Sequence, residues 1–280
     1  MKRPWTQTYH ASVPHEIDAD AYPSTVALFE EACARYADKA AFECFGRTMT
    51  YAEVDRAAHA VAAWLQNRAG IKRGDRVALM SPNVFAFPVA MLGIQRAGAA
   101  QVNVNPLYTP SELRHQLRDS GAETIIVFSG STQTLAEIVE DTPIRTVITV
   151  ELGDAGGVTI PTPPADPRLK GAIRFADVLS EGARLDLEPV AVTGEDTLFF
   201  QYTGGTTGPS KGALLSHRNL VANVQQFTAH MPEVVEPGKE IVVMALPLYH
   251  VFGLMIMHAY ESGGAKTGHG SGGIVRPRAE

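Results

Sequence analysis

The chain has 280 residues, of which 45% are hydrophobic and 19% are charged, and its formal net charge is -6. This length and hydrophobic content allow one large α/β domain or two ordinary ones, each with a sizeable core. The mild acidity leaves no basic surface, which argues against nucleic acid as a partner.

The two cysteines, Cys33 and Cys44, show neither CxxC spacing nor a Cys/His ligand pattern. They are too few for a disulfide framework, so a reducing cytosol fits best. The N-terminus lacks the apolar stretch of a secretory signal, and the apolar runs 84–94 and 251–257 are well short of the roughly 18 residues that span a bilayer. We therefore expect a cytoplasmic protein. Peripheral contact with the inner face of the membrane and formation of a homo-oligomer stay open.

Two helices are predicted near the start of the chain. Ser24 can cap a helix whose apolar residues recur at three-to-four spacing through Tyr36. Thr50 and Glu53 form a capping box, and an amphipathic pattern follows them through Leu65. Both helices have the pattern of structural scaffold.

From residue 75 onward, short apolar runs alternate with helical segments. The runs read as strands at 77–80, 100–104, 124–128 and 145–150, and the segments between them as helices at 84–97, 110–120 and 132–140. Thr109 and Glu112 form a capping box at the start of the second of these helices. Such alternation requires crossover connections. It predicts the α/β class, with mostly parallel sheets flanked by helices.

Residues 151–188 interrupt this pattern with many glycines and prolines. That composition suits a surface insertion better than a core element or a domain linker. A strand is predicted again at 197–202.

A glycine- and threonine-rich segment follows that strand. It reads Tyr202, Thr203, Gly204, Gly205, Thr206, Thr207, Gly208, Pro209, Ser210, Lys211 and Gly212. The glycines let backbone N–H groups approach an anion, the threonine hydroxyls add donors, and the lysine adds a positive charge. The segment is therefore predicted to hold phosphates, and a surface turn that binds nothing is the alternative.

The order of residues excludes a Walker A loop. That motif ends in Gly-Lys-Ser/Thr, whereas Ser210 precedes Lys211 here and Gly212 follows it. Residues 213–215 read as a strand before a helix that starts near Ser216. The loop is therefore expected to connect two strands.

The segment from Tyr202 to Gly212 resembles the phosphate-binding signature of the adenylate-forming (acyl-activating) superfamily, in the spelling of the bacterial long-chain fatty acid:CoA ligases. Residues 246–253, Leu-Pro-Leu-Tyr-His-Val-Phe-Gly, are similar to the family segment that lines the acyl pocket. By this resemblance the substrate-binding residues are Tyr249, His250, Phe252 and Gly253. The likeness runs from near residue 1 to about Met257.

The resemblance implies ATP-dependent activation of a fatty acid to an acyl-adenylate, followed by displacement of AMP by coenzyme A. Residues 202–212 would bind the phosphates of ATP, with Lys211 also serving catalysis. Mg²⁺ normally bridges such phosphates. No metal ligand is assigned, because Gly204 lacks the hydroxyl that other family members offer.

His250 has two readings. A lone histidine in an apolar stretch is more often a core residue, but the flanking likeness favours a catalytic role in orienting the substrate carboxylate. It would not act as a base, because a carboxylate is already ionised at neutral pH. His258 and His269 lack such context and are read as structural or solvent-facing.

Beyond residue 257 the sequence becomes glycine-rich. We expect residues 1–258 to form a partial N-terminal adenylate-forming domain, residues 259–280 to be a disordered tail foreign to the family, and the C-terminal domain to be absent. Such a truncated form would be inactive alone and would expose a sheet edge. The alternatives are a nucleotide-phosphate-binding module without catalysis and an interaction remnant.

Overall fold

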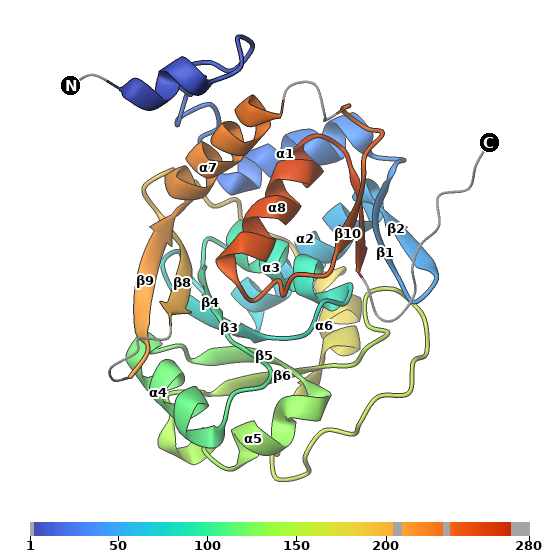
Figure 1. Ribbon diagram of the computed structural model, residues 1–280. Coiled ribbons are helices and arrows are strands. Elements are labelled where there is room, and N and C mark those ends of the chain that lie inside the picture. Colours follow the sequence, from blue (N-terminus) through green and yellow to red (C-terminus); the bar gives the residue numbers. More distant parts are fainter. Residues whose placement is uncertain (1–2, 204–208, 232–235, 270–280) are drawn as a thin grey trace.

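A computed structural model describes residues 3–203, 209–231 and 236–269 (Figure 1). Its strands are β1 (Ala40–Cys44), β2 (Arg47–Thr50), β3 (Arg76–Met80), β4 (Ala100–Asn103), β5 (Thr124–Phe128), β6 (Thr146–Val150), β7 (Ile173–Arg174), β8 (Thr197–Thr203), β9 (Lys211–Ser216), β10 (Ile241–Met244) and β11 (Lys266–His269). Its α-helices are α1 (Thr25–Tyr36), α2 (Tyr51–Asn67), α3 (Ala86–Arg96), α4 (Pro110–Ser120), α5 (Thr132–Ala136), α6 (Phe175–Gly182), α7 (His217–His230) and α8 (Val251–Ser262).

The strands form two sheets. The larger has the order β7-β6-β5-β3-β4-β8-β9, and every neighbouring pair in it is parallel except β8 and β9. The smaller has the order β10-β11-β1-β2, with only β1 and β2 antiparallel. The predicted α/β class with mostly parallel sheets is confirmed.

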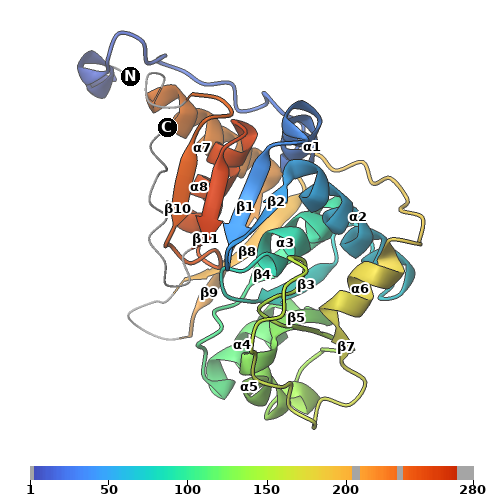
Figure 2. The ribbon, with the colours of Figure 1, turned by 90° about the vertical axis from the view of Figure 1, so that its right-hand side faces the viewer.

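The elements stack in layers. One core cluster joins Phe42 of β1, the helices α2 and α3, and one face of the larger sheet, which includes Leu79 and Ile126. A second cluster joins the opposite face of that sheet, including Ile125, to α4 and α5 through Leu117 and other residues. The helices α2 and α3 therefore lie between the two sheets, and α4 and α5 cover the outer face of the larger one (Figure 2).

The predicted caps are present. Ser24 accepts a hydrogen bond from the Ala27 backbone at the start of α1, and Thr50 forms a complete capping box with Glu53 at the start of α2. Thr109 forms another at α4, which ends at Gly121 in the left-handed conformation, at φ 63°. These boundaries depend on contacts within one helical turn, which is why the sequence predicts them well.

The insertion predicted at 151–188 contains regular structure that the sequence did not reveal. Strand β7 joins the edge of the larger sheet, and α6 packs on α2 with Phe175 and Val178 buried. A Cβ on Gly182 would lie 2.0 Å from the Ala60 carbonyl oxygen, so glycine lets the two helices approach. These elements are stabilised by partners that are distant in sequence, and the glycines and prolines around them predict a loop. Local composition therefore does not reveal them.

The expectation of a disordered tail is wrong for residues 259–269. Helix α8 continues to Ser262, and β11 follows between β10 and β1, hydrogen-bonded on both sides. The strand is short and contains Gly268, so only its two neighbours reveal it. The remainder of that segment, 270–280, lies outside the described residues.

Helix α5 is shorter than predicted. It ends at Ala136, and a separate 3₁₀ turn follows at Val139–Asp141.

Among the described helices, none combines the length and the apolar character needed to cross a bilayer.

Candidate functional site

The glycine-rich segment connects β8 and β9 at one edge of the larger sheet, as predicted. In this antiparallel pair Thr203 lies opposite Lys211, and Tyr202 lies opposite Gly212. Directly opposed residues project from the same face of a sheet. The exposed Thr203 and Lys211 side chains therefore stand together where the hairpin closes. Five predicted phosphate ligands lie outside the described residues: Gly204, Gly205, Thr206, Thr207 and Gly208.

Tyr202 anchors the first arm of the hairpin to α4. Its hydroxyl donates a hydrogen bond to Asp119 Oδ2 at 2.6 Å, and its ring meets the His115 ring edge to face at 6.4 Å. Burial, together with this bond, raises the pKa of Tyr202 above its usual range. Opposite, a Cβ on Gly212 would lie 3.0 Å from Tyr202 Cζ, so the glycine leaves room for the ring. In this arrangement Tyr202 supports the loop.

The second arm is held by the same helix. His115 Nε2 lies 2.8 Å from the Ser210 carbonyl oxygen and donates to it. Pro209 is exposed and Ser210 is half-buried. Helix α4 therefore fixes both sides of the hairpin just outside the segment 204–208.

His250 lies at the N-terminus of α8. Its side chain is exposed, and Nδ1 accepts a hydrogen bond of 3.4 Å from the Phe252 backbone N–H. The backbone N–H of His250 donates to the Pro247 carbonyl oxygen at 3.1 Å. Phe252 is 51% exposed, and Gly253 is buried against the same carbonyl, where a Cβ would lie 2.5 Å from the oxygen. The segment thus presents an imidazole and a phenyl ring at the surface.

The two predicted site segments meet at the carboxyl ends of the parallel strands. Gln201, in β8, donates from Nε2 to the Tyr249 carbonyl oxygen at 3.4 Å, and Tyr249 is half-buried. Asn103, at the end of β4, donates to Gln201 Oε1 at 2.9 Å. Open α/β sheets bind ligands at this edge.

Sequence reasoning missed the amides that make this junction. Gln201 and Asn103 are 6% and 3% exposed, and buried amides are retained where they have partners. A polar residue inside an apolar strand is the only local signal. It does not indicate which distant segment the amide contacts.

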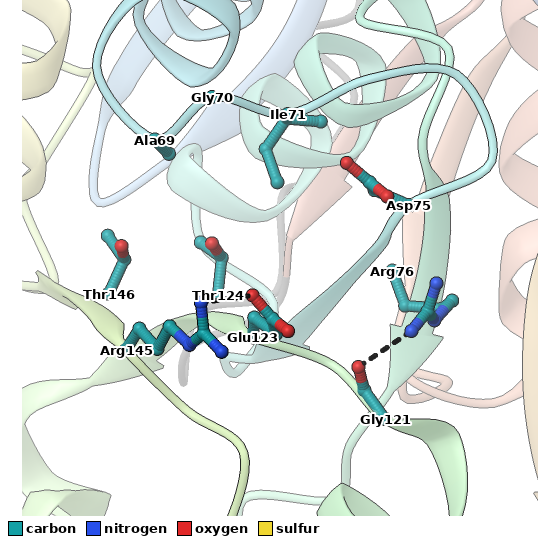
Figure 3. A pocket seen from close by; sticks show the side chains of 10 residues that line it. All are labelled: Ala69, Gly70, Ile71, Asp75, Arg76, Gly121, Glu123, Thr124, Arg145 and Thr146. Atoms are coloured by element: carbon teal, nitrogen blue, oxygen red, sulfur yellow. Dashed lines mark hydrogen bonds and ion pairs between the residues drawn. The ribbon is translucent and has the colours of Figure 1, made fainter.

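A cavity of about 260 Å³ lies at the amino ends of the parallel strands of the larger sheet, opposite to the candidate site. Figure 3 shows its lining, with Arg76, Thr124 and Thr146 at the amino ends of β3, β5 and β6. Arg76 donates to the Gly121 carbonyl oxygen, and Arg145 pairs with Glu123 at 3.5 Å. Its charged groups are paired and it lies away from the hairpin, so it is not part of the candidate site.

The described residues contain no group of three or more His, Cys, Asp or Glu side chains that could hold a metal ion. No metal ligand is therefore assigned.

Comparison with known proteins adds an independent observation. The family of AMP-binding enzymes matches residues 29–274, which include both the hairpin and the His250 segment. The chain belongs to this family. The match extends beyond Met257, where the likeness recognised from the sequence ends.

Within the AMP-binding family, the chain is similar to the long-chain-fatty-acid–CoA ligase of Salmonella typhimurium. The two are 48% identical over 265 residues, which cover 91% of this chain and 47% of the relative. The chain thus spans about half the length of the curated relatives it matches.

Solved structures of other ligases show the same fold. A long-chain-fatty-acid-CoA ligase from Archaeoglobus fulgidus aligns with a TM-score of 0.75 at 24% identity, over 93% of this chain and 49% of its own. An anthranilate CoA ligase, solved with anthranoyl-AMP, aligns with a TM-score of 0.78 at 22% identity, over 92% and 47%. The fold of this chain is therefore that of the N-terminal part of these enzymes.

Proposed function

We propose that this chain carries the phosphate-binding and carboxylate-orienting parts of an ATP-dependent fatty acid:CoA ligase. The observation that supports the proposal is the junction at the carboxyl edge of the larger sheet. There the hydrogen bond between Gln201 and the Tyr249 carbonyl brings the strand that leads to the glycine-rich loop beside the segment that presents His250.

In the first half-reaction, the fatty acid carboxylate attacks the α-phosphorus of ATP, the bond to the pyrophosphate breaks, and an acyl-adenylate forms. Enzymes assist such a displacement mainly by positioning the reactants and by stabilising charge on the leaving group. Lys211 and Thr203, adjacent on one face of the hairpin, supply an ammonium group and a hydroxyl for the leaving phosphates.

His250 orients the carboxylate in this proposal. Its Nδ1 accepts a hydrogen bond from Phe252 N–H, so in the neutral ring the proton is on Nε2, and that nitrogen is free to donate to a carboxylate oxygen. The exposed ring of Phe252 would contact the acyl chain, and the close packing of Gly253 fixes the start of α8.

In the second half-reaction, the thiol of coenzyme A attacks the acyl carbon and AMP leaves. None of the described residues is assigned to this step. Mg²⁺, entering with ATP, would neutralise part of the charge on its phosphates. It enters the proposal through the chemistry of ATP, and no step depends on a protein ligand for it. We further propose that the chain alone binds nucleotide phosphates without catalytic turnover.

The test measures nucleotide binding and pyrophosphate release separately. Lys211→Ala should weaken ATP binding roughly 10- to 100-fold, because a hydrogen bond to a charged group contributes about 1.5–3 kcal/mol. Lys170→Ala, at another exposed lysine, is the matched control and should bind ATP as the wild type does.

The outcomes separate the candidate functions. Pyrophosphate release that requires a fatty acid, followed by acyl-CoA on addition of coenzyme A, would establish the ligase and show that the chain turns over by itself. ATP binding that depends on Lys211 without release would support the phosphate-binding module. Equal binding by Lys211→Ala and wild type would refute the assignment of the hairpin.

A further inference from the structure

The segment 244–249 starts at the last residue of β10 and otherwise has no regular secondary structure, yet side-chain hydrogen bonds hold it. Asn83 makes three of them. Its Nδ2 donates to the Leu246 carbonyl oxygen at 2.8 Å and to the Met244 carbonyl oxygen at 3.3 Å. Its Oδ1 accepts from the Leu248 backbone N–H at 2.9 Å. One amide therefore satisfies three backbone groups of this segment.

Asn83 and the segment it holds follow strands of different sheets. It lies in the turn that follows β3, at the carboxyl edge of the larger sheet, whereas the segment leaves β10 of the smaller sheet. The hydrogen-bond partners are 161 to 165 residues apart in the chain. Asn83 is thus a tie between the two sheets beside the candidate site.

The tie leads directly to His250. The backbone N–H of His250 donates to the Pro247 carbonyl oxygen. Pro247 lies between Leu246 and Leu248, the two residues whose backbone groups Asn83 binds most closely. The same carbonyl packs against Gly253 of α8. A shift of the segment would therefore move the imidazole.

We propose that Asn83 is a positioning residue that sets the place of the His250 ring by clamping residues 244–248. Its effect on substrate rests on the proposed function, whereas its effect on His250 does not. Gln201, which donates to the Tyr249 carbonyl, holds the other end of the same segment. The two amides together fix His250 relative to the glycine-rich hairpin.

The test uses two replacements of Asn83, of which only the first keeps the size of the side chain. Asn83→Asp keeps the acceptor and loses both donated hydrogen bonds, and Asn83→Ala removes the amide entirely. The matched control is Asn67→Asp, since Asn67 Nδ2 also donates to two carbonyl oxygens, those of Ala63 and Asp186, at 2.8 Å each. This control lies at the end of α2, away from the site.

The first readout is the Cε1–Hε1 cross-peak of His250 in the intact chain, assigned by its loss in His250→Gln. In both Asn83 variants this peak should move by more than its line width or split, while the peak of His59 stays in place. In Asn67→Asp the His250 peak should coincide with that of the wild type. An unmoved His250 peak in the folded Asn83 variants would overturn the proposal.

The second readout is the Kd for fatty acid in the presence of ATP, because the chain alone is proposed to bind without turnover. Asn83→Asp should raise this Kd about tenfold, with the Kd for ATP changed less than twofold, because one well-placed hydrogen bond to a charged group is at stake. An unchanged Kd for fatty acid would refute the effect on substrate. If the wild type binds no fatty acid, the proposed function fails, and the His250 peak still decides the clamp.

Discussion

The buried histidine of α8 gives a prediction whose size follows from the structure. His258 is 1% exposed, its Nδ1 donates to the Leu254 carbonyl oxygen at 2.9 Å, and its Nε2 has no hydrogen-bond partner among the described residues. Burial lowers the pKa of His258 to about 4, from an ordinary value of 6.5. Replacing it by methionine removes the titrating group and keeps the volume apolar.

The sign follows from proton uptake. Between the two pKa values the unfolded chain binds a proton at His258 that the folded chain does not, so stability falls as the pH falls. From about pH 7 to about pH 5 the free energy of unfolding should drop by about 2 kcal/mol through this one group. His217, buried nearby with a pKa lowered by burial to about 4, adds a loss of the same sign.

The assay is urea unfolding of wild type and His258→Met across this pH range. The difference in unfolding free energy between the two should change by about 2 kcal/mol in favour of the variant at the acidic end. Burial raises the carboxyl pKa of Glu261, so this group makes the protein more stable as the pH falls. Taking the difference between wild type and variant cancels the contribution of Glu261 to the pH dependence. The exposed His59→Met is the control for the substitution. A difference that does not vary with pH would refute the reasoning.

Three further substitutions test local packing, each by thermal or denaturant unfolding. Gly253→Ala should destabilise the protein by about 1–3 kcal/mol, because its Cβ would lie 2.5 Å from the Pro247 carbonyl oxygen; an unaffected variant would show that this contact relaxes freely. Tyr202→Phe should cost about 1 kcal/mol, less than the about 1.5–3 kcal/mol of a bond to a charged group, since water can solvate the exposed Asp119; a larger loss would mean that the carboxylate is not solvated. Thr50→Ala should cost about 1 kcal/mol through loss of the capping box, while Thr50→Ser should retain most of the stability.

The sequence by itself determined the features that depend on near neighbours. The capping residues Thr50 and Thr109 set the starts of α2 and α4, because a cap bonds to the backbone within one turn. Alternating short apolar runs and helical segments determined the parallel sheet, since parallel strands need crossovers. The order of residues around Lys211 placed the glycine-rich loop between two strands.

Tertiary structure alone decided which short segments become strands. β1, β10 and β11 are four or five residues long, and although β1 also pairs with its neighbour β2, the parallel pairs of β11 with β1 and with β10 join segments that are distant in sequence. The same holds for β7 and α6, whose glycine- and proline-rich surroundings predict a loop. Burial against remote elements outweighs local propensity in such segments.

The candidate site shows the same division. Lys211 and His250 are recognised from their immediate neighbours in the sequence, because each lies in a motif of adjacent residues. The side chains that bring their segments together, Asn83 and Gln201, act through hydrogen bonds to backbone groups far along the chain. A backbone carbonyl carries no side-chain signature, so only the folded chain reveals these partners.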